Sequence, residues 1–105
     1  MNNKIDLQTI ADELDFDLED VEMLVEVFLS EAKKNLIDLK KAIDTNNLED
    51  IFRYAHSIKG SAANLTLQEI SNTAKKIEDN ARKNATFDYK ATYEILRQLI
   101  DNIRI

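Results

Sequence analysis

Glycine, proline and cysteine are almost missing from this chain of 105 residues, which contains one Gly, no Pro and no Cys. An average chain of this length has about 7 Gly and about 5 Pro. Because the turns of sheets and sandwiches depend on Gly and Pro, their scarcity argues against an all-β fold. The lack of Cys excludes disulfide bonds, thiolate metal ligands and a cysteine nucleophile, and it is compatible with a reducing cytoplasm.

Basic residues are outnumbered, since 14 basic and 20 acidic residues give a formal net charge of −6. Generic nucleic-acid binding and adsorption to anionic lipid both need a basic face, so the charge disfavours both kinds of partner. A membrane-spanning helix needs roughly 20 apolar residues, whereas the richest apolar run, Met23 to Leu29, is interrupted by Glu26. The length and the 44% of apolar residues predict one domain over residues 1–105 with one core. We expect a cytoplasmic location, because the chain has no Cys and no apolar segment behind its N-terminus that would indicate a secretory signal.

Apolar residues recur every three or four positions, which is the pattern of amphipathic helices. The expected helices cover about residues 6–14, 18–44, 48–65, 67–81 and 88–103. Asp17 is the expected N-cap of the second helix, and Asn46 or Asn47 that of the third. Four long helices with short connections predict an all-α fold, an up-down-up-down four-helix bundle with a short additional N-terminal helix. Such a bundle does not by itself specify a function.

The spacing also predicts which side chains are buried. The second helix is expected to bury Leu18, Val21, Val25, Phe28, Ala32, Leu36, Leu39 and Ile43. The last helix is expected to bury Ile95, Leu96, Leu99 and Ile103.

The junction before the fourth helix carries the most local signals. Thr66 is followed three residues later by Glu69, which is the spacing of a capping box, and a helix is therefore expected to start at Leu67. Leu65 and Ile70 occupy the two positions of a hydrophobic staple around it.

The single His, His56, and the single Gly, Gly60, lie four residues apart on one expected helix. Gly inside a helix costs about 1 kcal/mol relative to Ala, and the apolar pattern continues past Gly60. Because residues four apart are neighbours on a helix surface, Gly60 leaves space beside His56, and Lys59 adds an ammonium on the same side. At about 100° per residue, His56 lies about 120° from the centre of the apolar stripe, at the rim of the bundle.

This arrangement suits a nucleophile that accepts an anionic group from another protein. A neutral imidazole nitrogen is a competent nucleophile, and an ammonium stabilises phosphoryl oxygens. Taken singly, each residue has an ordinary explanation: His56 as a surface residue, Gly60 as a close helix–helix contact, Lys59 as a solvated charge. One mechanism accounts for all three together.

The segment from Tyr54 to Leu65, YAHSIKGSAANL, resembles the signature of histidine-containing phosphotransfer (Hpt) domains, His-x-x-Lys-Gly followed by small residues. That family has a four-helix bundle of about this size. The resemblance implies that His56 is the phosphorylated residue, that Lys59 orients the phosphoryl group and that Gly60 gives steric access. Ser61 is then a small polar member of the same surface.

Family members often place a polar side chain one helix later, where it bonds the imidazole. The matching residue in this chain is Glu78. Some family members have Gln at this position, and the related domain of chemotaxis kinases has Glu. The alternative interpretation is that Glu78 is a solvated charge that does not contact the imidazole. Arg82 matches a basic position in some members.

Phe52 and Ala63 are candidates for an apolar docking patch, with the core as the alternative place for Phe52. The family often has Gly where Thr66 stands, and because the capping box gives a local reason for Thr, we expect a different turn between the same two helices.

The resemblance implies a phosphorelay intermediate in two-component signal transduction. A response-regulator receiver domain, charged by a sensor (hybrid) histidine kinase, delivers a phosphoryl group from its aspartate to His56, and a second receiver accepts it. The divalent metal and most catalytic groups belong to the receiver. We therefore expect a phosphocarrier rather than an enzyme, without an ATP site, metal or cofactor of its own.

Two alternatives stay open: the phosphoacceptor domain of a chemotaxis-type kinase, and a binding-only bundle with an unused His. A metal-binding bundle fails because paired Glu-x-x-His motifs need more than one His. A hydrolase triad fails because Ser57, adjacent to His56, points elsewhere on a helix. The initiator Met favours a free-standing protein over an excised domain.

Overall fold

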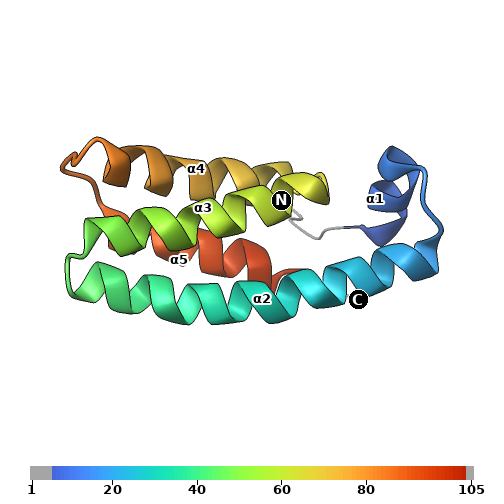
Figure 1. Ribbon diagram of the computed structural model, residues 1–105. Helices are drawn as coiled ribbons and strands as arrows, with labels where there is room; N and C mark the ends of the chain where they lie inside the picture. Colours follow the sequence, from blue (N-terminus) through green and yellow to red (C-terminus); the bar gives the residue numbers. More distant parts are fainter. Residues whose placement is uncertain (1–5, 104–105) are drawn as a thin grey trace.

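The computed structural model describes residues 6–103, and these residues form five helices. In chain order they are α1 (Leu7–Leu14), α2 (Leu18–Asp44), α3 (Leu48–Asn64), α4 (Gln68–Arg82) and α5 (Tyr89–Asp101). Helices α2 to α5 pack in the cyclic order α2, α3, α4, α5, and α1 packs against α2. Figure 1 shows that α2 extends beyond the end of α3, with α1 beside the extension. The expected all-α bundle with a short extra helix is confirmed.

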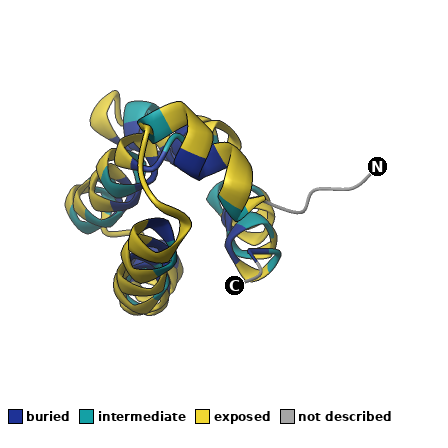
Figure 2. Ribbon diagram, turned by 90° about the vertical axis from the view of Figure 1, so that its right-hand side faces the viewer, coloured by how far each residue is buried: buried dark blue, intermediate teal, exposed yellow. Residues whose placement is uncertain are grey.

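Buried residues, dark blue in Figure 2, lie on the faces that the bundle helices turn toward one another. On α2 the expected stripe from Val21 to Ile43 is buried, each of its members being at most 6% exposed. Leu18, at the first turn, is the exception, because 41% of its surface is exposed. The three-or-four spacing on α2 therefore identifies the core-facing side of that helix.

The expected core positions on α5 are partly wrong. Ile95 is 53% exposed and Leu99 is half-buried, whereas Tyr93 and Ile100 are buried together with the correctly expected Leu96. The buried positions follow a spacing of three and four from Tyr93, so this residue defines the inner face. Ile95 lies two positions further on, about 200° around the helix, and points to solvent.

Side chains cap the starts of α1, α3 and α5. Asn47 is the N-cap of α3, and its Oδ1 accepts the N–H of Asp50 at 3.1 Å. Asp88 caps α5 in the same way, since its Oδ1 accepts the N–H of Ala91. Asp17 stands at the N-cap position of α2 as expected, but its side chain makes no capping hydrogen bond.

A residue with a left-handed backbone follows each of the first four helices, one or two positions after the helix ends. The φ angles lie between 54° and 59°, and the residues are Asp15, Asn46, Thr66 and Asn84. Asn and Asp adopt this conformation more readily than other non-glycine residues, but a β-branched residue does so only under strain. Thr66 is therefore the strained member of the set.

Thr66 belongs to the end of α3, and the expected capping box is wrong. The N–H of Leu67 donates to the carbonyl of Ala62 at 2.9 Å and that of Thr66 to Ala63 at 3.0 Å, which is a Schellman arrangement. Leu67 is the N-cap of α4 and makes no side-chain cap bond. The Thr66 hydroxyl is buried without a hydrogen-bond partner. Gly would adopt this left-handed backbone without strain.

Thr66→Gly is expected to stabilise the protein by about 1 kcal/mol. It removes left-handed strain of about 1–2 kcal/mol and a buried unpaired hydroxyl, partly offset by the greater backbone entropy of Gly. For a domain of this size, the melting temperature rises by about 4–8 °C. Asn84→Gly is the matched control and should shift it less, because Asn already tolerates this conformation. A lower melting temperature for Thr66→Gly contradicts the assignment.

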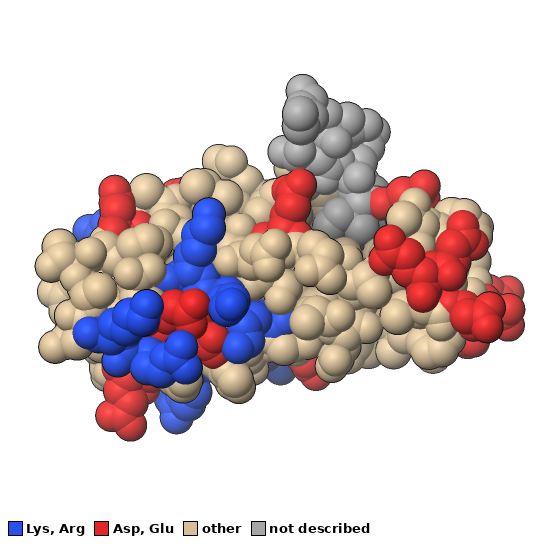
Figure 3. Space-filling view, turned by 90° about the horizontal axis from the view of Figure 1, so that it is seen from above, with Lys and Arg blue, Asp and Glu red and all other residues tan. Residues whose placement is uncertain are grey.

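Charge is segregated along the molecule. Residues 6–32 contain ten acidic residues and no Lys or Arg, so the remaining chain holds all 14 basic residues. Figure 3 shows the acidic side chains at the end where α1 lies and the Lys and Arg side chains gathered over α3 and α4. The acidic end also exposes the apolar side chains of Phe16, Met23, Leu24 and Val27.

Between residues 6 and 103, no helix is both long and apolar enough to cross a membrane.

Candidate functional site

His56 lies in the middle of α3, and its side chain is 61% exposed. The prediction that it stands at the rim of the bundle is therefore confirmed. Its ring turns toward α4, because Nδ1 contacts Oε1 of Glu78 across the helix pair. The opposite ring nitrogen, Nε2, is the one left for chemistry.

Glu78 is the buried polar centre of this site. It is only 3% exposed, and its two carboxylate oxygens contact different partners on α3. Oε1 meets Nδ1 of His56, and Oε2 accepts a hydrogen bond from the ammonium of Lys59 at 2.8 Å. The alternative of a solvated charge is wrong. The carboxylate instead joins the side chains of His56 and Lys59, which lie three residues apart on α3.

Burial and hydrogen bonding act in opposite directions on the Glu78 carboxyl. Burial alone raises its pKa, but the hydrogen bonds from Lys59 and then from His56 outweigh burial and lower the pKa below its ordinary value. Glu78 is therefore a carboxylate at neutral pH. A carboxylate only accepts hydrogen bonds, so Nδ1 of His56 is the donor, and in the neutral ring Nε2 is then the nitrogen with the lone pair. The contact thus fixes the tautomer of the neutral ring.

Gly60 faces open space. A Cβ placed on it meets no other heavy atom within 4 Å, so the interpretation of Gly60 as a close helix–helix contact is wrong. Gly60 is exposed, one turn after His56 on the same helix. Because Gly60 has no side chain, the surface beside the imidazole is open.

Ser71 is a member of the site that the sequence analysis missed. Its side chain is buried, and its hydroxyl donates to the backbone carbonyl of Lys59 at 3.2 Å. Ser71 and Glu78 are seven residues apart, so they lie two turns apart on the side of α4 that faces α3. Both are polar positions adjacent to the apolar stripe of α4, but that pattern alone does not show which residue of α3 each one meets.

The remaining expected site residues divide into two groups. Phe52 is half-buried, and its ring stacks on that of His56 with centroids 5.7 Å apart. Ala63 is exposed and Ser61 is half-buried on the same helix. Arg82 is 61% exposed and pairs with Asp79 at 3.0 Å, so its ion pair is on the surface of α4 rather than at the imidazole.

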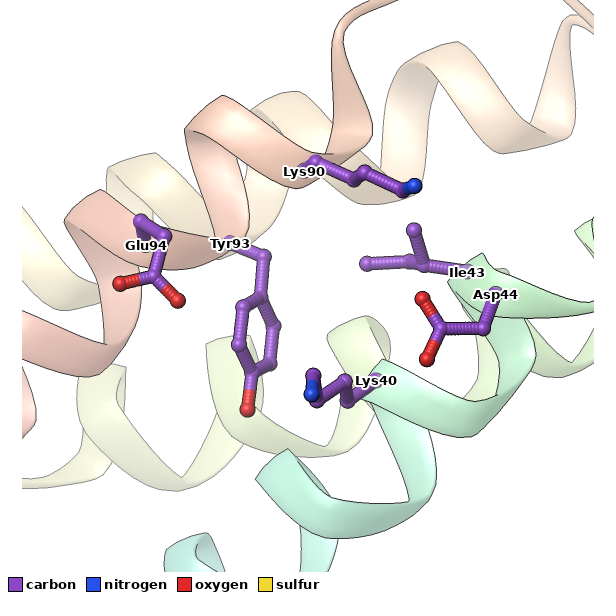
Figure 4. A pocket seen from close by; sticks show the side chains of 6 residues that line it. All are labelled: Lys40, Ile43, Asp44, Lys90, Tyr93 and Glu94. Carbon is purple, nitrogen blue, oxygen red and sulfur yellow. The ribbon is translucent and has the colours of Figure 1, made fainter.

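A shallow hollow lies elsewhere, between α2 and α5, with a volume of about 280 Å³. Figure 4 shows the side chains around it, which are Lys40, Ile43, Asp44, Lys90, Tyr93 and Glu94. Two cations and two carboxylates balance there, and the hollow is on the other side of the bundle from α3 and α4. Within residues 6–103, no group of three or more His, Asp or Glu side chains could hold a metal ion. The candidate site is therefore the α3–α4 surface around His56.

A family model described as the Hpt domain matches residues 23–104, which include every residue of this site. The chain belongs to the Hpt domain family. The solved structure of histidine-containing phosphotransfer protein B (HptB) from Pseudomonas aeruginosa PAO1 resembles this Hpt domain with a TM-score of 0.76. The likeness covers 90% of this chain and 80% of HptB at 19% sequence identity, and it supports the fold.

Two curated relatives of this Hpt domain are longer proteins. The phosphorelay intermediate protein YPD1 of Candida albicans is 38% identical over 60 residues, which are 57% of this chain and 33% of YPD1. The chemotaxis protein CheA of Borreliella burgdorferi is 43% identical over 72 residues, which are 60% of this chain and 8% of CheA. This Hpt domain thus spans a third or less of either relative.

Glu78→Gln is expected to lower the free energy of unfolding at neutral pH by about 1–3 kcal/mol, because it leaves the ammonium of Lys59 without its carboxylate. The pKa of Glu78 is lower in the folded than in the unfolded protein. The contribution of the Glu78 carboxylate to stability is therefore complete at pH values above its pKa in the unfolded protein, about 4.3. This contribution is lost as the pH falls through its pKa in the folded protein.

Urea unfolding at pH 7 and at pH 3 checks this expectation. The difference in stability between the wild type and Glu78→Gln should be larger at pH 7. Asp79→Asn is the control, because Asp79 forms a surface pair with Arg82 and its loss should cost under about 1 kcal/mol. Equal differences at the two pH values contradict the account of the Glu78 carboxylate.

Proposed function

We propose that this Hpt domain is a phosphorelay intermediate that carries a phosphoryl group on Nε2 of His56. The observation that carries the proposal is the contact of Glu78 with Nδ1 on an exposed ring, which makes Nε2 the nitrogen with the lone pair when the ring is neutral. The phosphoryl group comes from the aspartyl phosphate of a receiver domain charged by a sensor histidine kinase, and a second receiver removes it. YPD1, to which this chain is similar, is named a phosphorelay intermediate protein.

The transfer needs no proton movement on this chain. The Nε2 lone pair forms the N–P bond as the P–O bond to the receiver's aspartate breaks, and the carboxylate leaves with the electron pair. Because Nδ1 keeps its proton, the imidazole ring gains a positive charge, which the Glu78 carboxylate offsets. In the proposed transfer, the receiver supplies the divalent metal ion, and this chain acts as a phosphocarrier without a cofactor of its own.

Lys59 is proposed to orient the phosphoryl oxygens. Its side chain is 28% exposed, and its ammonium has three donors, of which Glu78 accepts one. The other donors can reach a group attached to the neighbouring ring. The surface of Gly60, with Phe52 and Ala63 on either side along α3, is the proposed docking area for the receiver, and Ser61 and Arg82 are proposed to support it.

The phosphoacceptor domain of a chemotaxis-type kinase is the second candidate. It is favoured by the similarity to CheA over 60% of this chain and by a Glu at position 78. The two functions differ in the donor. A chemotaxis kinase core with ATP should label His56 if the second candidate holds, and a charged receiver should label it if the first does.

Incubation with receiver domains charged by acetyl phosphate and Mg²⁺ tests the proposal, with intact-protein mass as the readout. We expect one acid-labile phosphoryl group per molecule. Phosphoramidate, a small donor that needs no docking, provides a second route to the same adduct. No adduct from a panel of charged receivers, together with none from phosphoramidate, contradicts the proposal and favours a binding-only bundle.

A further inference from the structure

Phe52 contacts the face of the His56 ring. The two ring planes are only 11° apart, with centroids separated by 5.7 Å. Phe52 lies one turn before His56 on α3, so the stacking is a contact between residues at i and i+4. Phe52 is half-buried and also packs against the hydrophobic core. The ring that meets the imidazole is therefore held by the bundle and does not move freely in solvent.

Two contacts restrain the imidazole in different directions. Glu78 holds the edge of the ring at Nδ1, and Phe52 lies along its face. An exposed His side chain would otherwise rotate about χ2, and a half-turn moves Nδ1 to the position of Cδ2 and Nε2 to the position of Cε1. The edge contact and the face contact together leave Nε2 pointing away from the protein.

We propose that Phe52 is a positioning residue for phosphoryl transfer, which stacks on the imidazole and keeps Nε2 directed outward. The inference rests on the proposed function of His56. Phe52 has a second effect once the ring is charged, because a cation is attracted to the face of an aromatic ring. The phosphorylated ring, which keeps the proton on Nδ1, carries such a charge. Stacking is therefore stronger in the phosphorylated protein than in the free protein.

Positioning and docking predict different results for Phe52→Leu, which keeps an apolar side chain but removes the aromatic face. A positioning residue affects transfer from every donor, including phosphoramidate, whose P–N bond breaks as ammonia leaves. A residue that only contacts the receiver affects transfer from the receiver alone. We expect Phe52→Leu to slow labelling by both donors about three- to tenfold, since a stacked aromatic pair contributes about 0.5–1.5 kcal/mol.

Matched variants separate this role from a general effect on α3. Phe52→Tyr keeps the aromatic face and should retain wild-type rates. Tyr54→Leu removes another half-buried aromatic ring from α3, one that stacks with Arg53 at 5.0 Å, and should also retain them. Nitrogen NMR of His56 gives an independent readout, in which Phe52→Leu should increase the fraction of rings protonated on Nε2. Circular dichroism shows whether each variant is folded.

The outcomes are distinguishable. If the wild type accepts phosphate from neither donor, the proposed function fails. If the wild type is labelled and Phe52→Leu matches it with both donors, the positioning role is overturned. If Phe52→Leu is labelled more slowly by the charged receiver alone, the positioning role is also overturned, and Phe52 is a docking contact. A loss with both donors that Phe52→Tyr restores supports the inference.

Discussion

His56→Gln is expected to abolish phosphorylation by a charged receiver and by phosphoramidate. Gln has the length to occupy the same surface but has no ring nitrogen with a lone pair, so no N–P bond can form. Because the His56 side chain is 61% exposed, the substitution leaves the core unchanged, and the free energy of unfolding should change by about 1 kcal/mol or less. Intact mass measures the labelling and circular dichroism the helicity.

Ser57→Ala is the control for this result. Ser57 is the neighbouring hydroxyl on α3 and is exposed, so a donor could reach it as easily as the imidazole. We expect Ser57→Ala to be labelled like the wild type. Normal labelling of His56→Gln would place the acceptor on another residue and refute the assignment.

Gly60→Gln is expected to raise stability while slowing phosphoryl transfer. Replacing Gly in the interior of a helix gains about 0.5–1 kcal/mol, and nothing within 4 Å opposes a side chain at this position. The same side chain covers the open surface beside His56 that an approaching receiver needs. We expect a higher melting temperature and transfer from the receiver at least about tenfold slower, the equivalent of about 1.4 kcal/mol or more in the barrier.

Two comparisons sharpen the Gly60 result. Gly60→Ala should gain a similar stability but slow the transfer less, because its methyl group stays close to the backbone. Phosphoramidate is small, so its reaction with Gly60→Gln should fall less than that of a receiver. A lower melting temperature for both variants contradicts the open surface seen at Gly60, and unchanged receiver transfer contradicts its role in access.

The helices of this fold could be predicted because the apolar spacing is regular. On α2 nearly every expected position is buried, since one continuous stripe faces the bundle from Val21 onward. On α5 the apolar residues are more numerous than the inner positions, and Ile95 and Tyr93 compete for the core. Spacing alone does not decide between them; packing against α2 and α4 places Tyr93 inside.

The end of α3 could not be predicted from local signals. Thr66 and Glu69 have the spacing of a capping box, yet the backbone of Thr66 is left-handed, with φ at 59°. Thr rarely adopts a left-handed backbone, so a Thr at this position does not predict the conformation that the structure shows. The geometry is imposed by the close packing of α3 and α4, which fixes where the chain must reverse.

The site was predicted in outline from three residues of one helix. His56, Lys59 and Gly60 share a segment, so their arrangement follows from helical geometry. Glu78 is on another helix, and whether it contacts His56 depends on the register between α3 and α4, which a single sequence does not show. Ser71 was missed for the same reason, since its partner is a backbone carbonyl across that interface.

The position of the phosphoryl group on the imidazole tests the central claim most directly. Phosphorus and nitrogen NMR of the protein labelled by a charged receiver distinguishes attachment at Nε2 from attachment at Nδ1. Because Glu78 holds the proton on Nδ1, the account predicts a single phosphohistidine at Nε2 of His56. Attachment at Nδ1, or on any other residue, would contradict it.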